Sequence, residues 1–219
     1  EFADMGYLPE AMRNYLARLG WGHGDDEIFT DAQATKRFDI IDVVSAPARL
    51  DWAKLNHLNN HYIRQAEPAR LAGLVAKILK SRDVHLKQGD EALILRTIPF
   101  VRDGAKTTLE LADAVMFVLK SRPMDIPEKV RGQLDAEMQG RIGRLRAALA
   151  AVGDWGFDPL AAALRAFADA EGVGMGKFGP QLRAILAGSA AAPDLAGTMT
   201  ALGRDESLAR IDDALSLPA

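Results

Sequence analysis

Residues 9–19 read PEAMRNYLARL, with apolar side chains at positions 12, 15, 16 and 19. This spacing places them on one face of a helix, and proline is favoured in the first turn of a helix. Residues 51–62 repeat the pattern, with Trp52, Leu55, Leu58 and Tyr62 on one stripe. No stretch shows the sustained alternation of a half-buried strand. The sequence therefore predicts an all-α fold of two or three helical bundles in series, with no significant sheet.

Further helices are expected wherever this periodicity lies between turn signals. Thr30 is a candidate helix cap, and Ser45-Ala46-Pro47 marks a turn. We expect three segments, 1–65, 66–150 and 151–219, with the last boundary between Leu149 and Leu160. The further helices are expected over 31–38, 68–82, 89–101, 107–121, 127–151, 158–171, 179–187 and 204–216.

The composition is that of an ordinary globular protein. Of 219 residues, 48% are hydrophobic and 26% are charged, which excludes a disordered chain. The absence of cysteine excludes disulfides and cysteine-ligated metals. No apolar run is long enough to span a membrane, and residues 1–4, EFAD, lack the basic region and apolar core of a signal peptide. We expect a monomeric cytoplasmic protein with no membrane partner. The first residue is not methionine, so we also expect a piece of a longer chain.

The net charge of −3 conceals an uneven distribution. Residues 1–63 have a balance of −4, residues 64–146 a balance of +5, and residues 147–219 a balance of −4. A basic segment can bind a polyanion whatever the global charge, although a solvated helix surface has the same composition. The charge distribution therefore permits a nucleic-acid partner and does not by itself indicate one.

Residue chemistry alone predicts no active site. Residues 174–179 read GMGKFG and fit a dinucleotide-binding pattern, but a helix is expected before them and not a strand, so the glycines are expected to end that helix. His57 and His61 are spaced as two metal ligands would be, yet their neighbours are poor zinc ligands. His23 lies in a glycine-rich turn that has no second histidine. We therefore expect no metal site and no catalytic residue in this stretch.

Three stretches of the sequence carry specific motifs. The first is 6–21, GYLPEAMRNYLARLGW, followed by EIFT at 27–30. The second is 45–64, SAPARLDWAKLNHLNNHYIR. The third, which is looser, is PQLRAILAG at 180–188 with LGRDESLARI at 202–211. In this order and at this spacing, the three stretches resemble bacterial glutamyl-tRNA synthetase.

This resemblance implies a class I aminoacyl-tRNA synthetase, which activates glutamate with ATP and transfers it to tRNA. It implies that this chain is the C-terminal half, with stem-contact helices at about 1–65 and an anticodon-binding region at about 66–219. The ATP and Mg²⁺ sites would lie upstream of Glu1, so this stretch would hold no cofactor and would not aminoacylate alone. The implied partner is tRNA-Glu, and not DNA.

Matching the motifs residue by residue implies several tRNA contacts. Arg183 matches the anticodon-contacting arginine of the family, and Pro193 and Leu195 match a loop whose backbone packs on anticodon bases. Lys54, Asn59, Tyr62 and Arg64 are candidates for contacts to the tRNA stem. Tyr62 in the core and Asn59 as a cap is an equally open alternative. Trp21, Trp52 and Trp155 are expected to pack in the core or at a junction between domains.

The sequence departs from the family at the position that reads the third anticodon base. Many relatives have an arginine just before a Lys-Thr-Leu helix start. Strict spacing from Lys106 places Gly104 there, whereas Arg102 lies two residues earlier. If Gly104 is the true match, the enzyme would also charge tRNA-Gln. The alternative to tRNA recognition as a whole is a catalytically inert helical module that binds a protein.

Overall fold

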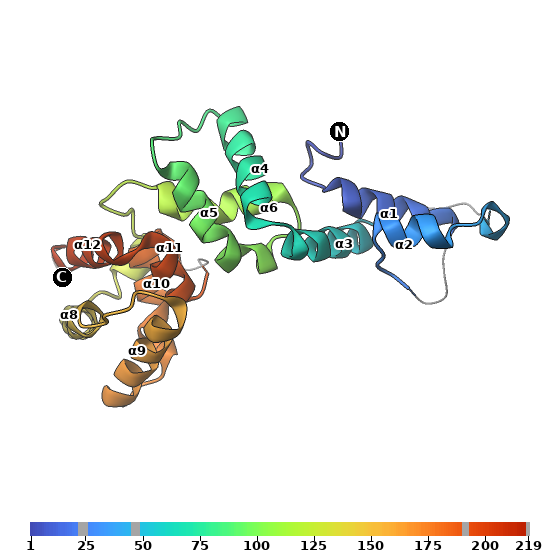
Figure 1. Ribbon diagram of the computed structural model, residues 1–219. Coiled ribbons are helices and arrows are strands. Elements are labelled where there is room, and N and C mark those ends of the chain that lie inside the picture. Colours follow the sequence, from blue (N-terminus) through green and yellow to red (C-terminus); the bar gives the residue numbers. More distant parts are fainter. Residues whose placement is uncertain (22–25, 45–48, 190–192, 218–219) are drawn as a thin grey trace. The chain divides into compact units, whose positions relative to one another are not determined.

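The computed structural model describes residues 1–21, 26–44, 49–189 and 193–217. Within these ranges the secondary structure is helical and contains no strand, which confirms the predicted all-α class (Figure 1). The helices are α1 (Pro9–Gly20), α2 (Asp31–Arg37), α3 (Trp52–Gln65), α4 (Pro68–Ser81), α5 (Asp90–Val101), α6 (Thr108–Leu119), α7 (Glu128–Arg131), α8 (Ala136–Ala150), α9 (Phe157–Ala170), α10 (Gly179–Ala187), α11 (Leu195–Leu202) and α12 (Arg204–Leu215), with 3-10 turns η1 (Ile40–Asp42), η2 (Arg102–Gly104) and η3 (Met175–Lys177).

Two expectations about helices were wrong. The single helix expected over 127–151 is two helices. Helix α7 ends at Arg131 with Gly132 as its cap, and Asp135 caps the start of α8 by accepting a hydrogen bond from the Met138 amide at 2.8 Å. The helix α11 was not expected at all. Seven of its eight residues are buried, so its sequence has no polar face and no detectable stripe.

Local signals at other helix ends were read correctly. Thr30 forms a capping box with Gln33 at the start of α2. After α9 the chain turns at Gly172, which has a φ of 64°, and the glycine-rich residues 174–179 continue into η3 and the start of α10. These glycines follow a helix, as predicted. The expected turns at His23 and at Ser45-Ala46-Pro47 lie outside the described residues.

By its internal contacts the chain divides into two units, and neither is continuous in sequence. Unit 1 contains residues 1–86 and 101–113, and unit 2 contains residues 87–100 and 114–219. The division of the sequence into 1–65, 66–150 and 151–219 stays a prediction about folding segments.

Unit 1 is organised by the packing of α1 against α3. Tyr7, Tyr15, Leu55 and Leu58 form its buried cluster. The Tyr15 hydroxyl accepts a hydrogen bond from the Asp51 amide at 2.6 Å, which fixes the start of α3 against α1. The periodic apolar residues of both helices therefore face each other, as their spacing predicts.

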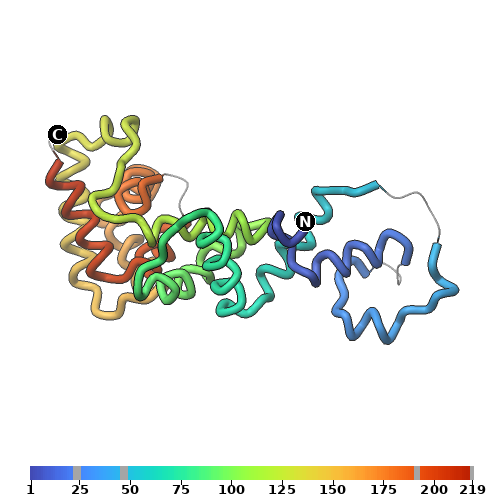
Figure 2. The backbone as a smooth tube through the Cα atoms, turned by 90° about the horizontal axis from the view of Figure 1, so that it is seen from above, coloured from blue at the N-terminus to red at the C-terminus, as the bar shows by residue number. Residues whose placement is uncertain are grey.

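Unit 2 is a bundle in which α9 packs on α11, and α12 packs on α8 and α10 (Figure 2). Its most unusual core residue is Arg210, whose side chain is 0% exposed. The Arg210 guanidinium donates to the carbonyls of Phe117 at 2.9 Å and Leu186 at 2.5 Å, near the ends of α6 and α10. Burial lowers the pKa of Arg210, and its salt bridge with Glu206 at 2.7 Å opposes that shift. This arginine joins three helices by satisfying carbonyls that the helices leave free.

The three tryptophans have different environments. Trp21 is 5% exposed and packs edge-on against Phe29, and Trp155 is half-buried and donates from Nε1 to the Met199 carbonyl at 3.1 Å. Both fit the expectation of core packing. Trp52 is 46% exposed and is not a core residue, and its ring contacts the rings of Phe2 and Tyr7 at centroid distances of 6.4 and 6.3 Å.

Candidate nucleic-acid interface

The anticodon candidates Arg183 and Pro193 lie together in unit 2. Arg183 is on α10, which starts with Gly179 and Pro180 after the fully buried Phe178. The half-buried Arg183 side chain donates from Nε to the Pro193 carbonyl at 3.3 Å. A Cβ atom on Gly179 would lie 3.7 Å from Nη1 of Arg183. The guanidinium is thus held between the first turn of α10 and the residues that lead into α11.

Leu195, the third candidate of this group, is the first residue of α11 and is 3% exposed. The preceding Asp194 caps the helix by accepting from the Gly197 amide at 2.9 Å. The Leu195 side chain is therefore part of the core, and only its backbone side remains for a contact. This agrees with the expectation that the backbone of the loop contacts the anticodon. The buried Leu195 also anchors the segment whose Pro193 carbonyl accepts from Arg183.

The third-base candidates Arg102 and Gly104 lie in η2 of unit 1. Arg102 is half-buried, with Nη1 3.5 Å from the Ala66 carbonyl at the end of α3. Gly104 is exposed, and a Cβ atom built on it meets nothing within 4 Å. Position 104 therefore has room for the Cβ atom of a larger residue.

Arg102 shares a hollow of about 440 Å³ with Arg64, which was expected to contact the stem. His61, Gln65 and Asp103 complete its lining. Arg64 is 57% exposed and lies 3.3 Å from the Asp103 carboxylate. Burial, followed by the nearby His57 and Arg64, lowers the pKa of His61, so that imidazole is held in its neutral form at pH 7. The hollow therefore presents two guanidinium groups, a neutral imidazole and the Asp103 carboxylate that pairs with Arg64.

Asn59 and Tyr62, two of the expected stem contacts, have structural roles in this fold. The tRNA surface proposed below does not include them. Asn59 is 0% exposed, accepts from the Leu8 amide at 2.8 Å and donates to the carbonyls of Gly6 and Lys106. The Tyr62 hydroxyl contacts the Phe29 carbonyl and a buried asparagine, both at 2.8 Å, and burial raises its pKa. Neither side chain has a free polar group on the surface.

Lys54 remains accessible, with 40% of its side chain exposed. Its ammonium is 3.8 Å from the Glu27 carboxylate, which also pairs with Arg18 at 3.0 Å. His57 is exposed one turn away, and no cluster of three metal-ligating residues occurs in the described ranges. Lys54 and Arg64 are thus the stem candidates that can reach a ligand.

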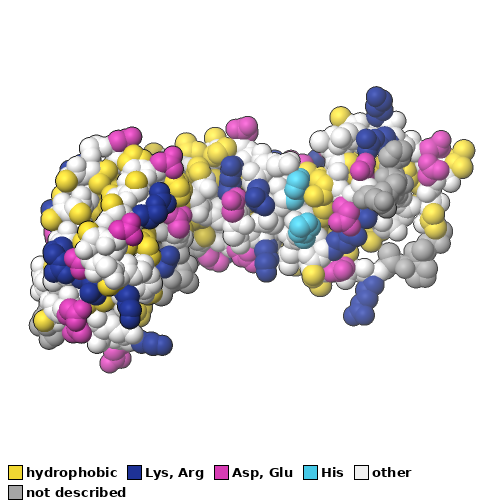
Figure 3. Space-filling model, turned by 90° about the horizontal axis from the view of Figure 1, so that it is seen from below, with side chains coloured by type: hydrophobic (Ala, Val, Ile, Leu, Met, Phe, Trp, Pro, Cys, Tyr) yellow, Lys and Arg dark blue, Asp and Glu magenta, His cyan; other side chains and the backbone are white. Residues whose placement is uncertain are grey.

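The basic segment is partly neutralised by ion pairs. Arg141 and Arg144 both bind Glu171, and their hydrogen bonds, that of Arg144 above all, lower the pKa of this carboxyl to about 2. Arg146 pairs with Asp212 at 2.8 Å. On the face shown in Figure 3, Lys and Arg side chains are interspersed with Asp and Glu side chains. Charge alone therefore does not mark a binding surface on this face.

Sequence reasoning did not identify which arginines are structural. Arg204 donates to the carbonyls of Val152 at 2.6 Å and Ala150, and its guanidinium lies 5.5 Å from the Trp155 ring centroid. Arg210, described above, is fully buried. The spacing of Glu206 and Arg210 is that of an exposed helical ion pair, so the sequence carries no signal for this burial.

A family model described as an anticodon binding domain matches residues 58–215. The chain therefore belongs to the family of all-helical anticodon-binding domains. Curated proteins that it resembles over nearly its whole length include glutamate–tRNA ligases. It is 74% identical over 216 residues to the glutamate–tRNA ligase of Phenylobacterium zucineum and 58% identical to that of Caulobacter sp. strain K31. In both cases the match covers 99% of this chain and 46% of the relative, so the chain spans about half the length of these relatives.

The fold is shared with solved structures of the same group. A glutamate–tRNA ligase from Elizabethkingia meningosepticum, crystallised with its amino acid, matches 98% of this chain with a TM-score of 0.78 and 26% identity. The match covers 42% of that chain. No helix in the described part of the present chain is both long and apolar enough to cross a membrane.

Proposed function

We propose that this chain recognises tRNA-Glu for a glutamate–tRNA ligase, through the anticodon and the stem. The observation that carries the proposal is the 74% identity to one such ligase over 216 residues, together with the match to an anticodon-binding family. A helical module that binds only another protein would not account for that family match.

In this proposal Arg183 reads an unstacked anticodon base. A guanidinium plane can stack on a base and donate two parallel hydrogen bonds. The Pro193 carbonyl orients this group, and the Pro193–Leu195 backbone packs on a neighbouring base. Lys54 and Arg64 contact phosphates of the stem, which positions the tRNA without reading sequence.

Arg102 and Gly104 determine whether tRNA-Gln is also charged. Gly104 has no side chain to read the third anticodon base, and Arg102 is turned toward the Ala66 carbonyl. We therefore propose a non-discriminating enzyme that accepts both tRNAs. The test is aminoacylation of tRNA-Glu and tRNA-Gln by the full-length protein and its Gly104→Arg variant. Charging of tRNA-Gln should fall in the variant, and rejection of tRNA-Gln by the parent would contradict the proposal.

The complete reaction belongs to the whole protein. We propose that glutamate, ATP and Mg²⁺ bind outside these 219 residues, and that this chain alone does not aminoacylate. We further propose that the protein is a cytoplasmic monomer and binds neither DNA nor membranes. Exchange of pyrophosphate into ATP, dependent on glutamate and tRNA, by residues 1–219 alone would refute the assignment of catalysis to the rest of the protein.

The direct test of recognition is the affinity of the full-length protein for tRNA-Glu. Replacing a base-reading arginine costs about 1–3 kcal/mol, so Arg183→Ala should weaken binding by about 5- to 150-fold. Arg165→Ala is the matched control, because Arg165 is an exposed arginine on α9 of the same unit. Equal affinities for the parent and Arg183→Ala would show that Arg183 is not a reader.

A further inference from the structure

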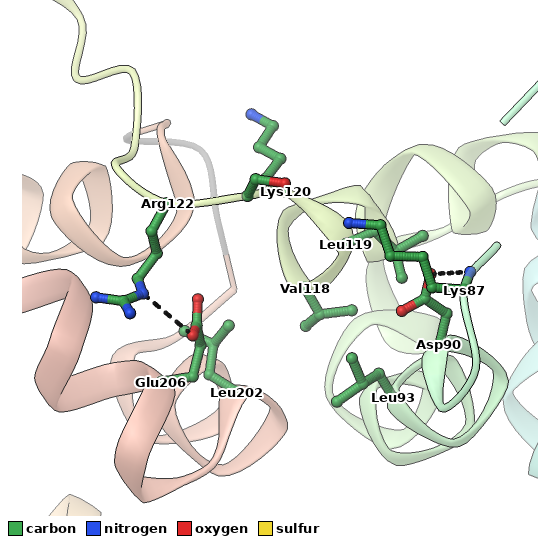
Figure 4. Close-up of a pocket in the computed structure, with 10 residues that line it drawn as sticks. Lys87, Asp90, Leu93, Val118, Leu119, Lys120, Arg122, Leu202 and Glu206 are labelled. Carbon is green, nitrogen blue, oxygen red and sulfur yellow. Dashed lines mark hydrogen bonds and ion pairs between the residues drawn. The ribbon is translucent and has the colours of Figure 1, made fainter. Parts of the chain in front are cut away.

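Unit 2 contains a hollow of about 300 Å³ (Figure 4). None of the residues proposed above to contact tRNA lines it. It lies between the start of α5, the end of α6 and the turn from α11 to α12. A volume of this size is at the lower end of the range for small-molecule sites. The hollow is therefore large enough for one flat ligand group.

The floor of this hollow is apolar and rigid. Leu93, Val118 and Leu202 form it, and the last two are 6% and 5% exposed. Arg96 holds the end of α11 by donating to the carbonyls of Ala201 at 2.8 Å and Leu202 at 3.0 Å. The end of α11, which carries Leu202, is thus held in place by hydrogen bonds within the chain.

The rim of the hollow carries two available ammonium groups. Figure 4 shows the Lys87 side chain extending toward the hollow, and Lys120 at its edge with the side chain directed away from Leu93 and Leu202. Neither lysine ammonium forms an ion pair with another residue in the described part of the chain.

The carboxylates at this rim are already engaged. Asp90 accepts a hydrogen bond from the backbone amide of Lys87 at 2.7 Å. Glu206 pairs with Arg122 at 3.5 Å, and Arg122 also contacts Asp213 at 3.3 Å. The rim around the apolar floor therefore carries the cations of Lys87, Lys120 and Arg122 together with the carboxylates of Asp90 and Glu206.

We propose that this hollow binds one unstacked nucleotide of the tRNA, with the base on the floor and flanking phosphates on Lys87 and Lys120. This inference rests on the proposed function. Bases in a loop can leave the stack and lie on apolar surfaces, whereas duplex bases cannot. A duplex would supply phosphates for the lysines but nothing for Leu93, Val118 and Leu202.

The test uses the full-length protein, an anticodon stem-loop RNA and a blunt duplex of the same stem without the loop. Lys87→Ala/Lys120→Ala should weaken stem-loop binding about tenfold. It should also reduce the slope of the log binding constant against log salt concentration by about 1.4, because two contacts to single-strand phosphates are lost. Leu93→Ser should weaken stem-loop binding and leave duplex binding unchanged. Lys77→Ala/Lys129→Ala, which removes two exposed lysines elsewhere, is the control.

Each outcome decides the proposal. Equal losses on the stem-loop and the duplex would mean phosphate contacts without a bound nucleotide, and would overturn it. Unchanged binding in the double-lysine variant would also overturn it, while salt-dependent binding by the parent would leave the proposed function standing. If the parent does not bind tRNA at all, the proposed function fails as well. Matching thermal unfolding curves for parent and variants would exclude misfolding.

Discussion

Replacement of Arg210 by methionine tests whether unit 2 depends on a buried guanidinium. Methionine keeps much of the side-chain length and removes every donor. The Phe117 and Leu186 carbonyls, at 2.9 and 2.5 Å, and the Lys120 carbonyl at 3.0 Å would then lose their partner. A hydrogen bond from a charged donor contributes about 1.5–3 kcal/mol. Loss of the two fully buried bonds should thus lower the free energy of unfolding by about 3–6 kcal/mol. Burial of the apolar methionine side chain offsets part of this loss. We therefore expect unit 2 to be less stable by about 3–5 kcal/mol.

Trp155 can report this loss, because it lies in unit 2 while Trp21 and Trp52 lie in unit 1. In a Trp21→Phe/Trp52→Phe background, urea unfolding followed by Trp155 fluorescence should show a lower midpoint for Arg210→Met. Arg165→Met, an exposed position, is the control and should change stability by less than about 0.5 kcal/mol. A loss below about 1 kcal/mol for Arg210→Met would refute the assignment of Arg210 as a structural link.

Three further predictions concern stability. Asn59→Ala should cost unit 1 about 2–4 kcal/mol in thermal unfolding, because two buried hydrogen bonds and one partly buried hydrogen bond are lost, and tRNA affinity of the folded variant should be unchanged. Gly6→Ala should cost about 1–3 kcal/mol, since Gly6 has a φ of 87° and a Cβ there would lie 2.9 Å from the Leu109 amide. The Glu171 carboxyl, with its pKa lowered to about 2 mainly by Arg144, stabilises unit 2 above pH 4.5 and loses this effect as pH falls toward 2. Melting temperatures of Glu171→Gln should therefore depend less on pH in that window, and an unchanged pH dependence would contradict this role.

The periodicity of the sequence predicts helices well where one face is polar. The helices α1 and α3 each have such a face, and both were placed within a few residues. The helix α11 has none, because it is buried on nearly every side, and a pattern of 3.6 residues cannot appear without a polar side. Tertiary burial, and not local propensity, thus limits what periodicity can show.

The candidate site was predictable only in part, for a related reason. Arg183 follows from the resemblance, but its contact with the Pro193 carbonyl depends on how α10 and α11 pack. From its residue type and its position on the helix, Asn59 is as well suited to a surface contact as to a buried structural role. Its burial follows from the approach of Gly6 and Lys106, which are 53 and 47 residues away in the sequence. Such long-range contacts leave no local signal.

The most direct test of the account is a double-mutant cycle between Arg183 and the anticodon. The affinities of the full-length protein and of its Arg183→Ala variant are measured for tRNA-Glu and for the same tRNA with its anticodon replaced. The account predicts that the parent loses about tenfold or more on replacement of the anticodon, and that Arg183→Ala loses much less, because the contact is already absent. Equal binding of both tRNAs by the parent would contradict the claim that this chain recognises the anticodon.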